Sequence, residues 1–283
     1  MGRLKYTADD DEEPDPREAE DREQFVFAES EVLLHHVSET LLRLYLAHEG
    51  APPCPWLEIA RVRGAGQFKR MVSKRFADEL PPEERRQRVG EVFFGSAERT
   101  AIKPNPPQEQ WEKSLDNIEA FLTHYARHFL DADIYNALKH GLAVRPGPAA
   151  MQLGDGDLIK AEGPAIEYLT LGENSEGKRR WFHTTHWIEV DSALAFISIA
   201  QRLMESIWTL ARFRYLGEKP ELLVAWTKPE YAEVIRHLHD GQESGIFTDR
   251  MHMELLYYAA PDEAPETPEA NGTDASEPDP GGP

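Results

Sequence analysis

The feature that most constrains the fold is a long apolar repeat that begins near Gln108. Its members recur in alternating steps of four and three residues, which is the spacing of one face of an α-helix. Such a face has to be buried against other helices, so the repeat predicts a helical bundle. Continued at 100° per residue without a break, the same face includes Ala132, Asn136 and His140. The repeat itself consists of Trp111, Leu115, Ile118, Leu122, Tyr125 and Phe129.

Three more helices are predicted upstream of this repeat. An apolar stripe predicts a helix over residues 25–48, which Gly50 and Pro52-Pro53 end. A second helical pattern runs from about residue 56 to 76, and a third, shorter one follows Pro81-Pro82. Together with the long repeat, they give the bundle enough helices to enclose a core.

Downstream of the bundle, the pattern changes to short β-type runs. Residues 166–171 and 180–190 flank a polar loop and predict a β-hairpin, and residues 251–258 predict a final strand. Between them, residues 192–215 form an apolar, centrally placed helix with Asp191 as its N-cap. We also expect a short strand over residues 222–226 and a helix over residues 229–239.

The predicted fold class is therefore α+β, mainly a helical bundle with a small antiparallel β-sheet and a further central helix. Residues 25–142 form the bundle and residues 143–260 an α+β part packed on it. Residues 1–24 and 261–283 are expected to be disordered acidic tails, because they lack the apolar side chains that offset the entropy of ordering. The two ends contribute about −13 of the net charge of −20.

Cysteine content and hydropathy indicate a cytoplasmic protein. Cys54 is the single cysteine, so no intramolecular disulfide can form. The N-terminal residues show no basic-then-apolar signal pattern, and apolar runs such as residues 193–200 are too short to cross a membrane. We expect a reducing location, no membrane contact and no cofactor.

A polar cluster ends the bundle at residues 133–141, with the sequence Asp-Ile-Tyr-Asn-Ala-Leu-Lys-His-Gly. Asn136, Lys139 and His140 supply an amide, an ammonium and an imidazole, which are groups that a binding or catalytic site could use. An alternative interpretation is an ordinary helix end, in which Gly141 is the C-cap and the basic side chains complement the helix dipole.

The Asn136-Ala137-Leu138-Lys139-His140 stretch, at the end of long helices, resembles the HEPN group of helical domains. That group includes RNA-cleaving toxins, antiviral-defence proteins and non-catalytic relatives. Its motif places an Arg before a polar residue, often Asn, and a His four to six positions after the Arg. Tyr135 stands where the Arg is expected. The match covers these few residues and the helical layout of residues 25–142.

The resemblance implies two functions. In the first, the protein is a HEPN-like binding or regulatory module that contacts RNA. In the second, it is a metal-independent ribonuclease of the toxin or antiviral-defence type that uses His140. The missing Arg favours the first, since charge stabilisation usually dominates such a reaction and Lys139 lacks the bidentate fork of Arg.

A basic segment offers a surface for RNA. Residues 61–76 contain six Lys or Arg and no acidic residue, in a chain that is otherwise acidic. Arg70, Lys74 and Arg75 are the candidate RNA contacts, and a solvated basic face is the structural alternative. A homodimer is a second candidate partner.

A third function, a metal-binding helical-bundle enzyme, rests on residues beside the apolar repeat. Imidazoles at positions i and i+4 can bind one metal ion, and bundles build such sites from facing helices. The chain has no Glu-x-x-His pair of the di-iron kind. The residues concerned are His124, His128, Asp131 and Tyr135, with His36 and Glu39 on the first helix.

The ribonuclease alternative makes a direct prediction. Purified protein should cleave structured RNA in the presence of EDTA, and His140→Ala should abolish cleavage because the proton-transferring imidazole is lost. A gel assay of RNA fragments checks this. A binding module without catalytic activity leaves the RNA intact.

Overall fold

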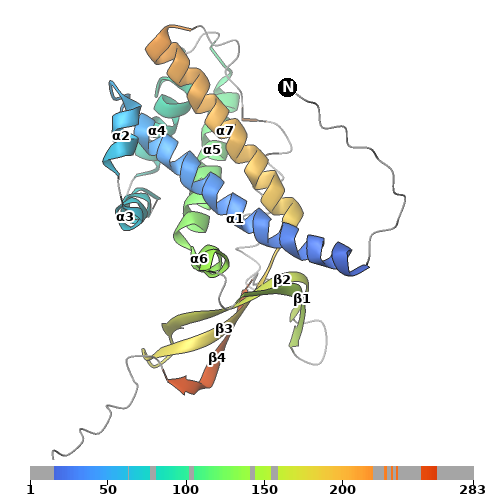
Figure 1. Ribbon diagram of the computed structural model, residues 1–283. Helices are drawn as coiled ribbons and strands as arrows, with labels where there is room; N and C mark the ends of the chain where they lie inside the picture. Colours follow the sequence, from blue (N-terminus) through green and yellow to red (C-terminus); the bar gives the residue numbers. More distant parts are fainter. Residues whose placement is uncertain are drawn as a thin grey trace, which may run out of the picture.

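The computed structural model describes residues 16–62, 64–76, 81–101, 105–140, 144–153, 159–218, 226–227, 231, 234 and 250–259. These residues form seven α-helices, a short 3-10 helix and one antiparallel four-stranded sheet, so the predicted α+β, mainly helical class is confirmed (Figure 1). Within them, no helix combines the length and the apolar character that crossing a membrane would need.

Four long helices form the bundle, and shorter ones cover its sides. The long helices are α1 (Pro16–His48), α4 (Pro82–Phe94), α5 (Gln108–Leu130) and α7 (Val190–Leu216). The shorter ones are α2 (Pro55–Arg61), α3 (Ala65–Phe76), α6 (Asp133–His140) and the 3-10 helix η1 (Arg99–Ala101).

One apolar core joins α1, α4, α5 and α7. Leu41, Ile118, Phe121 and Leu203 are each completely buried in it. The Tyr125 hydroxyl on α5 donates a hydrogen bond of 2.6 Å to the carbonyl of residue 196 on α7. Helices that precede and follow the strands β1–β3 in the sequence therefore share one core.

The sheet contains β1 (Val144–Leu153), β2 (Ile159–Glu173), β3 (Arg179–Trp187) and β4 (Arg250–Ala259), in the order β1-β2-β3-β4. The predicted hairpin corresponds to β2 and β3, and the predicted final strand to β4. β1 was not predicted, because Pro146, Gly147 and Pro148 are typical of loops. These residues are tolerated since β1 is an edge strand, where a missing N–H does not interrupt the sheet.

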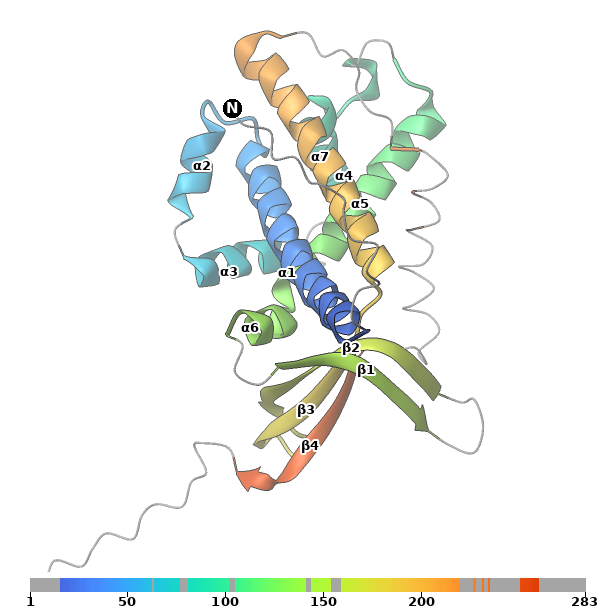
Figure 2. The ribbon, with the colours of Figure 1, turned by 45° about the vertical axis from the view of Figure 1, so that its right-hand side comes forward.

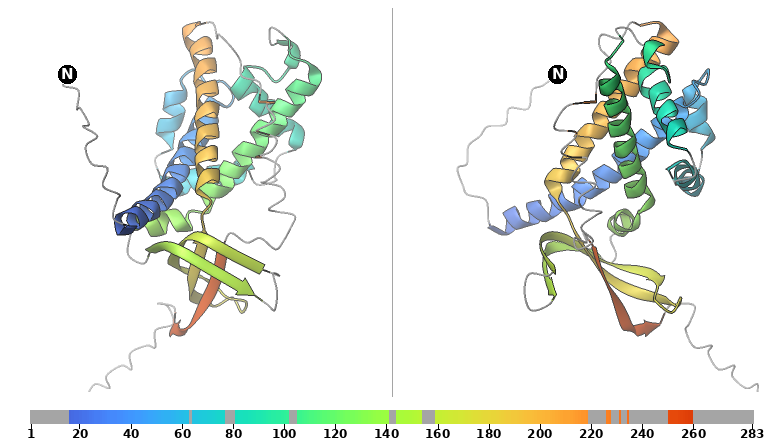
Figure 3. Two further views of the ribbon diagram at one scale, coloured as in Figure 1. Left: turned by 90° about the vertical axis from the view of Figure 1, so that its right-hand side faces the viewer. Right: turned by 180° about the vertical axis from the view of Figure 1, so that it is seen from behind.

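The sheet lies at one end of the bundle, under α6 and the N-terminal half of α1 (Figures 2 and 3). A small apolar cluster makes this contact: Phe27 from α1, Ile134 from α6, and Ile166 and Tyr168 from β2 are all buried, as is Ile188 after β3. The sheet thus closes the end of the bundle where α6 lies.

Three predicted helix boundaries are wrong. α1 begins at Pro16, within the predicted tail, because the residues that follow this proline are good helix formers. The helix predicted over residues 56–76 is broken between Arg61 and Ala65, where Gly64 weakens it. The residue that caps α7 is Glu189, not Asp191. The strand and helix predicted at residues 222–226 and 229–239 lie almost entirely outside the described residues.

The shared core predicts that α7 is essential for the stability of the bundle. Leu203→Ala should lower the free energy of unfolding by about 2–5 kcal/mol, because Leu203 is completely buried and its truncation leaves a cavity that the surrounding side chains fill only in part. Leu194→Ala is the matched control, since Leu194 on the same helix is 46% exposed, and it should cost less than about 0.5 kcal/mol. Urea unfolding followed by far-UV circular dichroism measures both. Equal losses would contradict a core shared by α7.

Candidate functional site

The long helix does not continue through the polar cluster. α5 ends at Leu130, and a new helix, α6, begins at Asp133. The expectation that Asn136 and His140 face inward is therefore wrong: both side chains are exposed, as is Lys139. Their role in binding or catalysis remains a prediction, and the structure places them on the surface of a short helix.

A charge interaction with the sheet marks the break between the two helices. Arg250 on β4 pairs with the Asp131 carboxylate at 2.8 Å, and its Nε donates a hydrogen bond of 3.2 Å to His186 on β3. The Ala132 side chain, next to Asp131, is buried. Although burial acts in the opposite direction, Arg250 lowers the pKa of Asp131, so this residue stays ionised and paired at neutral pH.

Two of the residues proposed as metal ligands, His124 and Tyr135, are instead stacked on other rings. The His124 ring lies 4.0 Å from that of Phe196 on α7, and the His35 ring lies 3.9 Å from that of Tyr135 and almost parallel to it. The His35 and His128 rings are 6.1 Å apart. Across the described residues, no three His, Cys, Asp or Glu side chains gather into a group that could hold a metal ion. The geometry therefore lends the metal-binding alternative no support.

The basic segment divides into two parts with different surroundings. Arg70 and Lys74 are exposed on α3, whereas Arg75 turns towards the bundle, where its Nε donates a hydrogen bond of 2.6 Å to Glu49. Lys69 on α3 and Lys139 on α6 both act electrostatically on His35. Helices α3 and α6, which carry these residues, are neighbours in Figures 1 and 2.

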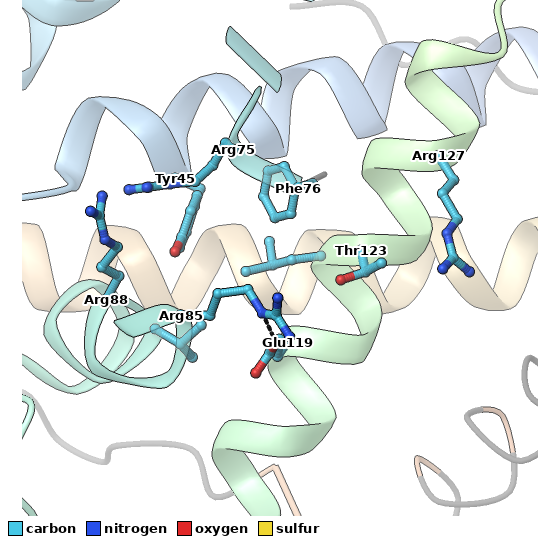
Figure 4. A pocket seen from close by; sticks show the side chains of 10 residues that line it. Tyr45, Arg75, Phe76, Arg85, Arg88, Glu119, Thr123 and Arg127 are labelled. Carbon is cyan, nitrogen blue, oxygen red and sulfur yellow. Dashed lines mark hydrogen bonds and ion pairs between the residues drawn. The ribbon is translucent and has the colours of Figure 1, made fainter. Parts of the chain in front are cut away.

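Four arginines from three helices line one pocket, which we call the arginine pocket (Figure 4). Arg75 comes from α3, Arg85 and Arg88 from α4, and Arg127 from α5. The pocket has a volume of about 290 Å³. The other lining residues are Tyr45, Phe76, Val89, Glu119, Leu122 and Thr123, which add an apolar floor, a hydroxyl and one carboxylate.

Carboxylates hold three of these arginines in place. Arg85 Nε lies 2.6 Å from Glu119 Oε1, as the dashed line in Figure 4 shows. Glu49, next to the pocket, pairs with Arg75 and lies 3.8 Å from Arg88, which also pairs with Glu84. The guanidinium groups are therefore fixed in orientation before any ligand arrives.

Arg127 differs from the other three. No described residue forms an ion pair or a hydrogen bond with its guanidinium group, and the side chain is exposed at the edge of the pocket (Figure 4). A guanidinium group presents several N–H donors in a planar fork that matches the oxygens of phosphate or carboxylate. Arg127 can therefore bind an anion without first losing a protein partner.

Burial affects the acid–base chemistry beside the pocket. It raises the pKa of Glu49, although hydrogen bonds from Arg75 and Tyr45 act in the opposite direction. Burial and the nearby Glu49 carboxylate raise the pKa of Tyr45 well above its ordinary value. Tyr45 therefore keeps its proton at neutral pH and can act only as a hydrogen-bond partner, not as a phenolate base.

Apart from Arg75, the residues of the arginine pocket were not predicted from the sequence. Arg85 and Arg88 lie on a helix with many charged residues, which is typical of a solvated face. Glu119, Thr123 and Arg127 on α5 are spaced by four residues, so they form one polar stripe beside the apolar repeat. This stripe is a weak sequence signal for the pocket. Searches against protein-family models, curated proteins and solved structures found no match to this chain.

The buried histidines predict a loss of stability in mild acid. Burial lowers the pKa of His35 and His124 to about 4, and that of His128 to about 3, from an ordinary value of 6.5. As the pH falls from 6.5 towards 4, the unfolded chain takes up protons at these positions and the folded protein does not. Each histidine should therefore remove about 1.4 kcal/mol of unfolding free energy per pH unit in this window.

A single variant tests this origin of the pH dependence. His124→Phe keeps a ring against Phe196 but cannot take up a proton, so the stability of this variant should fall less steeply between pH 6.5 and 5 than that of the wild type. His140→Phe, which changes an exposed ring on α6, is the control. Urea midpoints at several pH values provide the measurement, and equal slopes for His124→Phe and wild type would refute the explanation.

Proposed function

We propose that the protein is a HEPN-like helical binding module that contacts RNA through the arginine pocket and the exposed basic face of α3. The observation that carries this proposal is the convergence of four arginines from three helices on one pocket. Guanidinium groups are the protein groups best suited to phosphate oxygens, because they offer paired donors and keep their charge at all relevant pH values.

The arrangement of the basic residues fits an extended ligand. Lys139 lies on α6, Arg70 and Lys74 lie on α3, and the arginines of the pocket come from α3, α4 and α5. A single-stranded nucleic acid that runs along these helices would meet several positive charges, with aromatic side chains such as Phe76 in the pocket wall. Positive grooves with aromatic residues are the general form of single-strand binding sites.

The acidity of the rest of the chain limits the kind of binding. At a net charge of −20, the protein repels nucleic acid at long range, so non-specific attraction is weak. Binding therefore depends on short-range contacts at the few basic positions. This favours recognition of particular RNA shapes or ends over coating of the RNA backbone.

A binding role fits the geometry better than catalysis by His140. His140 is exposed at the end of α6 and is not part of the arginine pocket. Tyr135, at the position where the family has its Arg, stacks on His35 and carries no charge that could stabilise a phosphorane. The proposed role therefore requires only that phosphate groups be bound.

Removal of Arg127 tests the proposal. Arg127→Ala should weaken the binding of a fluorescein-labelled single-stranded RNA about tenfold, because one charge-assisted contact to phosphate is lost. The plot of log affinity against log salt should also become shallower by about 0.7, the value for one phosphate contact on a single strand. Fluorescence anisotropy at several salt concentrations measures both quantities.

Two further variants complete the experiment. Arg70→Ala combined with Lys74→Ala should weaken binding in the same way, because both side chains are exposed on α3. Arg145→Ala is the matched control, since Arg145 is 83% exposed but lies on β1 of the sheet, and its loss should leave affinity unchanged. Wild-type affinity in the Arg127→Ala protein would exclude the arginine pocket as the RNA site.

A further inference from the structure

A second pocket lies where the end of α1 meets the start of α2 and the last turns of α7. Its volume is about 230 Å³. Its walls are mainly apolar and include Leu44, Ile59, Ala211 and Leu216, and two tryptophans, Trp56 and Trp208, complete them. We call it the tryptophan pocket.

The two tryptophans are much more exposed than the side chains of the apolar core. Trp56 is 60% exposed and Trp208 41% exposed, and their ring centroids lie 5.4 Å apart with the planes tilted by 48°. Large aromatic side chains left in water next to a concave apolar surface are typical of binding sites. Their flat faces are suited to stacking on another flat ring.

One polar group in the pocket lacks a partner. The His48 ring is part of the wall although the residue is only 6% exposed, and among the described residues none forms a hydrogen bond with this ring. Burial, and to a smaller extent Arg214, lower the pKa of His48 to about 4, so the ring is neutral at physiological pH. A neutral imidazole offers one N–H donor and one nitrogen acceptor.

The charged groups around the pocket already have partners. Arg212, in the wall, pairs with Glu218 at 2.7 Å, and Arg214 donates a hydrogen bond to the carbonyl of residue 91. The Tyr215 hydroxyl donates to the carbonyl of Pro52 at 2.7 Å. Arg212 is the charged side chain among the lining residues, and because it is paired, the described wall offers a charged ligand no unpaired counter-charge.

From these contacts we infer that the tryptophan pocket binds an uncharged, planar aromatic molecule that carries one hydrogen-bonding group. Its ring stacks on Trp56 and meets the tilted ring of Trp208 at an angle, and its polar atom bonds to His48. The tryptophan pocket and the arginine pocket share no lining residue. The inference is thus independent of the proposed RNA contact.

Cys54 provides a direct readout. It is the only cysteine of the chain and it lines the tryptophan pocket, so an alkylating reagent reports on this pocket alone. Indole is a suitable probe, because it is flat, uncharged and carries one N–H. Near-saturating indole should slow the alkylation of Cys54 by N-ethylmaleimide about fivefold or more, and cyclohexanol, which has a hydroxyl but no flat ring, should not.

Variants at the pocket define the mode of binding. Trp56→Ala should weaken indole binding about tenfold in calorimetry, because stacking on one aromatic ring is lost. Leu57→Ala is the matched control: Leu57 is 57% exposed beside Trp56 but is not part of the wall. His48→Leu should weaken binding by a similar factor through the lost hydrogen bond, with circular dichroism to confirm that it folds.

Three results would overturn the inference. Indole could leave the alkylation rate of Cys54 unchanged up to its solubility limit. Cyclohexanol could protect as well as indole, which would show that the pocket selects size and not aromatic character. Trp56→Ala could bind indole as tightly as the wild type, which would exclude stacking. A variant that binds indole as tightly as the wild type must be folded, so unfolding cannot explain the last result.

Discussion

Burial of one apolar core between α1, α4, α5 and α7 is the interaction on which the rest of the structure depends. Side chains such as Leu41, Phe121 and Leu203 are completely removed from water there. This core fixes α7 against α1, and Ile59 of α2 packs against it. Helix α3 packs through Phe68 and Val72 on a neighbouring cluster with residues of α1 and α5. Both pockets lie where those shorter helices meet the long ones, so their shapes follow from the packing of the bundle.

The break between α5 and α6 has the largest functional consequence. An unbroken helix would have carried Asn136 and His140 into the bundle, where they would need partners. Arg250 instead binds Asp131 at the break, and α6 turns so that Ile134 packs on the sheet. The polar residues of α6, Asn136, Lys139 and His140, therefore face water. A site that the helical spacing placed in the bundle is exposed on the surface.

The electrostatics of the arginine pocket are compatible with the anionic ligand that we propose. Glu49 and Glu119 neutralise arginines in the free protein, which keeps the folded state from carrying unpaired buried charge. Arg127 has no such partner among the described residues, which is why the proposed phosphate contact is assigned to it. The tryptophan pocket is the opposite case, since its charged neighbours are paired and its unused groups are aromatic rings and one neutral imidazole.

The sequence by itself determined the helices of the bundle, the β2–β3 hairpin and the final strand, because apolar periodicity and turn residues are local properties. It also identified the basic segment that contains Arg70, Lys74 and Arg75. The tertiary structure alone decided where the long helix breaks, because the partner of Asp131 lies more than a hundred residues away on β4. The same reason applies to Arg75, Arg85 and Arg127, which come from three different helices. The spacing of residues along one helix does not say which residues of another helix lie close to them, so only the fold could bring these arginines together.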